Sequence, residues 1–222
     1  MTSQAHLSAI QILRQQDGSM RIKDLPHVNV ETIQEQGAVT GRNWQAELGL
    51  PTYLEEWEAM ARIRGLSSRH IRFVLMDESV TRLPGNPRLQ PQQITLPPSA
   101  SCSLELGHTG FVVGVVYTFL LGFDELRTQI PSMFGFEPPN GLEGDYIIGQ
   151  AQLFDSLLAD KAWEGLQRGI FTHTCPLLFR HTEEHAGTGK LVEVALTPGD
   201  YPGCPGAGVL KIWDAGGRHD AA

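Results

Sequence analysis

Alternating apolar and polar residues predict that strands dominate this chain. Seven segments have the two-residue period or the continuous apolar composition of strands that are buried on at least one face. They are Ser103–Leu106, His70–Met76, Phe111–Leu121, Tyr146–Leu153, Ile170–Phe179, Lys190–Thr197 and Val209–Trp213. Gly114 interrupts the most apolar segment, which predicts a bulge or a close backbone approach at that position.

Two segments carry the apolar spacing of helices instead. In Leu50–Gly65 the apolar stripe includes Trp57 and Met60, which we interpret as core contacts. Pro51 suits a first helical turn, and Gly65 suits the left-handed residue that follows a helix.

The second predicted helix is Phe154–Arg168. Its apolar residues, among them Leu158 and Leu166, follow helical spacing. Asp155 or Ser156 is expected to cap its first turn, and Gly169 to end it.

The other segments lack a clear period. Ala5–Gln16 suits a short helix or a frayed terminus, and Met20–Leu25 an edge strand. Pro26–Gln45 is expected to be a loop with at most one short strand. The Pro-rich Asp77–Ser101 is expected to be a flexible loop or arm, and Asp124–Gly144 an insertion loop.

Strands therefore outnumber helices, and they do not alternate with them regularly. We predict a β-rich α+β fold, in which a curved sheet or barrel is closed by helices. Residues 1–101 would form an N-terminal extension with helix 50–65 and the Pro-rich loop. Residues 102–222 would form the core, and the whole chain one continuous domain of 222 residues.

Charge and hydropathy exclude some classes of partner. The formal net charge is −8, so a nucleic acid or an anionic membrane surface is not expected to bind, because both need clustered Lys and Arg. No run of about 18 apolar residues predicts a membrane span. Met1–Gln16 lacks the pattern of a secretory signal. Three widely spaced cysteines do not form a disulfide framework, which favours a reducing compartment.

Candidate chemistry gathers around Cys175, near the middle of the strand that follows the second helix. A thiolate is a strong nucleophile, and a nearby histidine can take the proton of a thiol. His108 lies in a glycine-flanked break between two predicted strands, and Glu193 lies on a later strand. His173, two residues before Cys175, shares its face of a strand and is a supporting partner or an alternative base.

This order of motifs resembles the tailed-phage prohead maturation proteases, which share a fold with the herpesvirus assemblins. The resemblance covers about residues 102–213. Gly169–Cys175 matches the family's nucleophile motif, and Leu191–Leu196 its later Glu-containing strand. Asp200–Gly203 matches a following turn, and His108 matches the upstream His. Two residues depart from the family pattern: Cys175 stands where the family has Ser, and Pro176 where it has Gly or a small apolar residue.

The resemblance implies a peptidase that processes capsid or scaffold proteins during phage-type head assembly. Cys175 would be the nucleophile, His108 the base and Glu193 the residue that orients the base, as in other triads. It implies no metal or other cofactor, and a site of action in the host cytoplasm or within a procapsid. A homodimer is compatible with it.

Other interpretations stay open. Cys175 suits a small core residue, His108 an ordinary turn residue and Glu193 a surface partner of Lys190. The Cys and Pro176 departures favour an alternative function, a catalytically inactive protease-like scaffold or assembly module. His181–His185 has the His-x-x-Glu-His spacing of inverted zinc peptidases. That chemistry needs a helix, whereas the glycines that follow favour a hairpin tip, so no bound metal is expected there.

Overall fold

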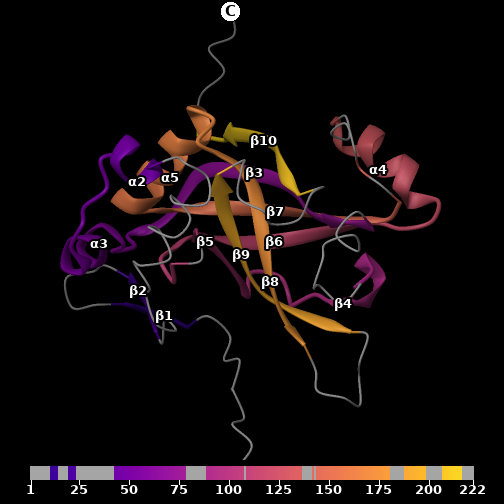
Figure 1. Ribbon diagram of the computed structural model, residues 1–222, viewed down its shortest axis with the longest axis horizontal. Coiled ribbons are helices and arrows are strands. Elements are labelled where there is room, and N and C mark those ends of the chain that lie inside the picture. The colour runs from indigo at the N-terminus through magenta and orange to yellow at the C-terminus, as the bar shows by residue number, and fades with distance from the viewer. Residues whose placement is uncertain are drawn as a thin grey trace, which may run out of the picture.

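An eight-stranded mixed sheet dominates the fold (Figure 1). The computed structural model describes residues 11–14, 20–23, 43–78, 89–107, 109–136, 142, 144–180, 188–198 and 207–216. The sheet consists of β3 (Gly65–Asp77), β4 (Ile94–Thr95), β5 (Cys102–Leu106), β6 (Val112–Gly122), β7 (Tyr146–Asp155), β8 (Phe171–Arg180), β9 (Gly189–Pro198) and β10 (Gly208–Asp214). A separate hairpin is formed by β1 (Gln11–Arg14) and β2 (Met20–Lys23).

The strand order is β10-β3-β7-β6-β5-β9, and β8 pairs with β9. The short β4 also pairs with β9, in parallel. Figure 1 shows that β8 and β9 run across the direction of β6 and β7, so the sheet is strongly twisted. The β-rich α+β class is confirmed, but the barrel alternative is wrong, because the sheet is not closed. The predicted strands 111–121, 170–179 and 190–197 all lie in this one sheet.

The helices in the described part of the chain are few and short. They are α2 (Trp44–Glu47), α3 (Leu54–Met60), α4 (Leu126–Phe134), α5 (Leu157–Gln167) and the 3₁₀ turn η2 (Pro91–Gln93). Figure 1 shows α2, α3 and α5 together on one side of the molecule and α4 on the other. No helix in the described part of the chain is long and apolar enough to span a membrane.

The main core lies between the sheet and the helices α2, α3 and α5. Trp57 stacks on Phe111 at 4.9 Å, and Trp44 meets Phe171 edge-on at 5.3 Å between ring centroids. All four rings are almost completely buried. Aromatic pairs of this kind contribute about 0.5–1.5 kcal/mol beyond the area that they bury, so they hold the N-terminal helices against β6 and β8.

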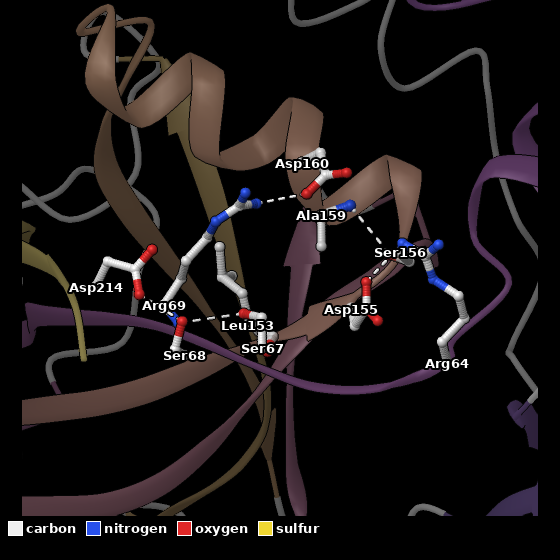
Figure 2. A network of polar contacts seen from close by, with 10 residues as sticks. All are labelled: Arg64, Ser67, Ser68, Arg69, Leu153, Asp155, Ser156, Ala159, Asp160 and Asp214. Carbon is white, nitrogen blue, oxygen red and sulfur yellow. Dashed lines mark hydrogen bonds and ion pairs between the residues drawn. The ribbon is translucent and has the colours of Figure 1, made fainter. Parts of the chain in front are cut away.

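Helix α5 confirms the predicted helix and its caps. Ser156 Oγ accepts a hydrogen bond from the Ala159 N–H at 3.1 Å, and Gly169 takes φ 66° just after the helix. Figure 2 shows two ion pairs beside it, Arg64 with Asp155 at 2.6 Å and Arg69 with Asp160 at 2.5 Å. The second pair joins α5 directly to β3.

Helix α4 corrects the loop predicted for Asp124–Gly144. Pro131 lies inside this helix and provides no N–H for the carbonyl of Arg127, four residues earlier. Tyr146 Oη donates to that carbonyl instead, at 2.6 Å. Ile130 packs with Tyr146 and Ile148 in a small second cluster. Tertiary contacts therefore offset the local cost of the proline.

The first predicted helix is wrong at both ends. It covers Leu54–Met60, not Leu50–Gly65, and Gly65 begins β3. The physical reason is pairing, because the Arg64 N–H bonds to the Asp155 carbonyl at 2.8 Å and starts the alignment of β3 with β7.

The N-terminal predictions have mixed outcomes. Residues 11–14 form a strand, which corrects the helix expected within Ala5–Gln16, whereas the strand expected at Met20–Leu25 is confirmed over Met20–Lys23. In the segment 26–45 expected to be a loop, Trp44 and Gln45 begin α2, and residues 26–42 lie outside the described residues.

The Pro-rich segment is packed where it is described. Leu89 and Ile94 are buried in the main core. Gln90 and Gln93 cap η2 reciprocally, and Ile94 pairs with Gly189 of β9. The expectation of a flexible arm is therefore wrong for residues 89–98. Residues 79–88 lie outside the described part.

Gly114 makes the close approach that the sequence predicts. A Cβ at this position would lie 2.6 Å from the carbonyl oxygen of Gln152 on β7. At Gly208, in the same sheet, the nearest atom would be the Thr172 oxygen at 3.5 Å, an ordinary contact.

We therefore expect Gly114→Ala to lower the free energy of unfolding by about 1–3 kcal/mol, because β6 and β7 must move apart. Gly208→Ala is the matched control and should leave stability unchanged or raise it by up to about 1 kcal/mol. Urea denaturation measures both. Equal stabilities of the two variants would contradict the close approach.

Candidate active site

The site is organised by β9, which has β5 on one side and β8 on the other. It pairs with β5 in parallel and with β8 antiparallel. The register sets Glu105 opposite Ala195, and Ala195 opposite Cys175. These three residues form one row across three strands, with side chains on the same face.

That face is turned away from the main core. The alternating residues Leu104, Leu106, Val194 and Leu196 belong to the core. Because side chains alternate along a strand, Cys175 and its row lie on the opposite face. The side chain of Cys175 is half-buried, so that reagents can reach it.

Glu193 lies on the same face, two residues before Ala195. It pairs directly with Ser103 of β5, so it is diagonal to both Cys175 and Glu105. Diagonal neighbours in a sheet are roughly 7–8 Å apart, within reach of a long side chain. Glu193 is only 8% exposed. It is therefore not the simple surface partner of Lys190 that the sequence left open as an alternative.

His173 also shares this face, as predicted. It pairs with Thr197, in the row next to that of Cys175. Its Nδ1 lies 3.0 Å from the Thr172 hydroxyl oxygen. The structure thus brings Cys175, Glu193 and His173 together on three consecutive rows.

His108 lies outside the described residues, so its pairing with Cys175 stays a prediction. The residues on either side of it are described. The Gly107 N–H bonds to the Leu196 carbonyl at 3.0 Å, and the Thr109 N–H bonds back to the Leu106 carbonyl at 3.2 Å. The described residues on both sides of His108 are therefore held by backbone hydrogen bonds, and Gly107 is held against β9.

Glu105 is a candidate that the sequence reasoning missed. Its side chain is 3% exposed, and its Oε2 accepts a hydrogen bond from the Gly110 N–H at 3.1 Å. Its Oε1 lies 3.4 Å from the Ser103 hydroxyl. The sequence analysis treated it only as part of the alternating strand Ser103–Leu106, and the available signal was its position three residues before His108.

Thr197 was missed as well. Its side chain is fully buried, and its hydroxyl has no hydrogen-bond partner among the described residues. A buried polar group without a partner lowers the stability of the fold by roughly 1–3 kcal/mol. Thr197 is therefore a destabilising position beside the candidate site.

The two thiols in the described part of the chain differ sharply in burial. Cys102 is fully buried in the main core, and burial, together with the charges of Glu193 and Glu105, raises the pKa of its thiol to about 12. Cys175 is half-buried on the other face. Cys204 lies outside the described residues. Cys102 is therefore expected to react slowly in the folded protein.

Metal-binding side chains do not cluster in the described ranges, where no group of three or more His, Cys, Asp or Glu residues could hold an ion. The His181 and His185 pair lies outside these ranges, and so the zinc alternative is untested. β8 and β9, on either side of it, form an antiparallel hairpin.

No model of a protein family matches the chain, and comparisons with curated proteins and with solved structures found no match.

We expect iodoacetamide to modify Cys175 in the native protein and Cys102 only after unfolding. A thiol with a pKa of about 12 is ionised in only about one molecule in 10⁴ at pH 8. Mass spectrometry of the digested protein measures both sites. Equal modification of the two thiols in the native state would contradict the assigned burial.

Proposed function

We propose that the protein is a thiol peptidase that cleaves capsid or scaffold proteins during phage-type head assembly. The observation that carries the proposal is the register of β5, β9 and β8, which sets the half-buried Cys175 beside the buried Glu193 on one face. The resemblance to prohead maturation proteases supplies the substrate class and the site of action, host cytoplasm or procapsid.

The chemistry follows from the residue types. His108 takes the proton of the Cys175 thiol, and the sulfur attacks the carbonyl carbon of a peptide bond. The C–N bond breaks, a thioester forms, and His108 returns its proton to the departing amine. Water then attacks the thioester, the carboxylic acid leaves, and the thiol is regenerated.

Glu193 fits the role of the acid that orients the imidazole. A buried carboxylate beside a histidine fixes its tautomer and stabilises the imidazolium that forms. Its position on the face that carries Cys175, two residues before Ala195, supports this role.

The decisive experiment is co-expression with a phage-type capsid or scaffold protein. Cys175→Ala and His108→Ala should each slow processing by about 10³-fold or more, and the double variant should be no slower, because the residues of such a unit are not additive. Cys175→Ser should keep some activity, since the resembling family uses Ser. Cys102→Ala is the matched control and should process normally.

An inactive assembly module is the competing function, and Pro176 beside the thiol favours it. Under that reading the native protein binds the same capsid or scaffold protein, but Cys175→Ala leaves both binding and the length of the partner unchanged. That result would replace the peptidase proposal.

A chelator separates the thiol from the zinc chemistry. We expect 1,10-phenanthroline to leave processing unchanged, because the thiol reaction needs no metal. Elemental analysis should find no stoichiometric zinc. About one zinc per chain, together with loss of activity in the chelator, would overturn the thiol mechanism.

A further inference from the structure

We propose that His70 of β3 is an acid-sensitive catch for the strand β10. The neutral imidazole holds Trp213 of β10 against the sheet. Protonation of the imidazole weakens this hold, so that β10 opens locally while the rest of the sheet stays folded. This inference concerns regulation of the fold and does not depend on the proposed function.

β10 is weakly fastened to the main sheet. Within the described part of the chain it pairs with β3 alone, and each of its seven residues is at least partly exposed. A bulge between Val209 and Lys211 interrupts the pairing. Segments with few buried contacts open at a lower free energy than the core does. Local opening of β10 is therefore expected before opening of β9, whose residues are mostly buried.

Contacts with β3 fasten the last residues of β10. The His70 ring stacks on the Trp213 ring, with centroids 5.1 Å apart and planes inclined by 9°. The Arg72 guanidinium lies 5.7 Å from the centre of the same indole. The Ser68 hydroxyl donates to the carboxylate of Asp214, and Figure 2 shows these two side chains next to each other. The stack on Trp213 is thus the central contact of this end of the strand.

The surroundings of His70 suit the neutral imidazole better than the charged one. Its Nδ1 is buried and has no hydrogen-bond partner among the described residues. The neutral ring can carry its proton on Nε2, whereas the imidazolium carries a proton on both nitrogens and would bury an unsatisfied N–H. The charge of Arg72 beside the same indole also disfavours a second cation there.

Strands β3, β10, β6 and β7 surround the His70 ring. Their titratable and charged groups near it are Arg69, Arg72, Lys211, Asp214 and Tyr117. Tyr117 meets the ring edge-on at 5.8 Å, and the partner of His70 on β7 is the neutral Gln152. Burial lowers the pKa of His70, and the charge of Asp214 opposes this effect without cancelling it.

Acid therefore favours the open form of β10. His70 binds a proton more weakly in the folded state than in an opened chain, so the opened state takes up more protons as the pH falls. The stabilisation that the neutral stack provides begins to be lost below about pH 6.5, the ordinary pKa of histidine. The loss is complete once His70 is protonated in the folded state as well.

Opening of β10 also affects the start of β8. A Cβ on Gly208 of β10 would lie 3.5 Å from the Thr172 carbonyl oxygen of β8. The Thr174 hydroxyl of β8 donates to the Val74 carbonyl of β3 at 2.9 Å, and Val74 is the sheet partner of Gly208. β10 therefore lies beside the place where the strand that carries Cys175 rests against β3.

Hydrogen exchange followed by mass spectrometry tests the catch at pH 7.5 and at pH 5.0, with each rate corrected for the intrinsic rate at that pH. Amide protection of Gly208–Asp214 should fall by about three- to tenfold in acid, whereas protection of Gly189–Pro198 should stay constant. His70→Phe keeps a ring on Trp213 but cannot titrate, so this variant should protect β10 equally at both pH values.

A second variant keeps the test informative where His70→Phe fails to fold. Trp213→Leu removes the stack, so β10 should already be poorly protected at pH 7.5 and should lose little more in acid. In the unmodified protein, an NMR titration of the His70 ring should give a pKa below the ordinary value of about 6.5.

Three results would overturn the catch. The first is an equal loss of protection in β10 and β9, and the second is a loss in His70→Phe as large as that of the unmodified protein. The third is a His70 ring that titrates at or above about pH 6.5. Because none of these measurements involves cleavage of a partner protein, the proposed function stands or fails separately.

Discussion

The alignment of β9 with its two neighbours is the constraint on which the site depends. Ala195 is fixed opposite Glu105 on one side and opposite Cys175 on the other. A shift of one residue would turn Glu193 into the main core and take Val194 out of it, so the hydrophobic pattern itself holds the register. The same apolar residues that build the core thus aim the polar ones away from it.

Parallel pairing of β5 and β9 requires a long connection between them, which here contains β6, α4, β7, α5 and β8. Helix α5 ends at Gln167, and β8 begins at Phe171, just after Gly169, so the helix sets the start of the strand that carries Cys175. The ion pair of Arg69 with Asp160 joins it to β3. This pair adds little to the stability of the fold, because both side chains are partly exposed. Burial of its apolar face against the sheet provides the main stabilisation.

Local signals were sufficient where neighbouring residues decide the structure. Helix α5 has a capping serine and a terminal glycine, and Gly114 marks a close approach, so these were predictable. Helix α4 was not, because the Arg127 carbonyl left without its usual donor by Pro131 is satisfied by Tyr146, which is distant in sequence.

Some residues of the candidate site could likewise be predicted from local sequence, and others could not. Alternation along a single strand placed His173 on the face of Cys175. The position of Glu105 depends on which strand lies beside β9, and its burial depends on a turn that folds back over it. The residues near Glu105 in the sequence therefore predict neither its position nor its burial. The Pro-rich segment was misjudged for a related reason, since Ile94 gains its partner from β9, almost a hundred residues away.

The central proposal is that the imidazole of His108, which follows β5, lies beside the thiol of Cys175. The most direct test is an experimental crystal structure at a resolution that defines both side chains. The account predicts a separation below about 4 Å between the nearer ring nitrogen of His108 and Sγ of Cys175. A well-ordered His108 ring on the opposite face of the sheet from Cys175 would contradict it.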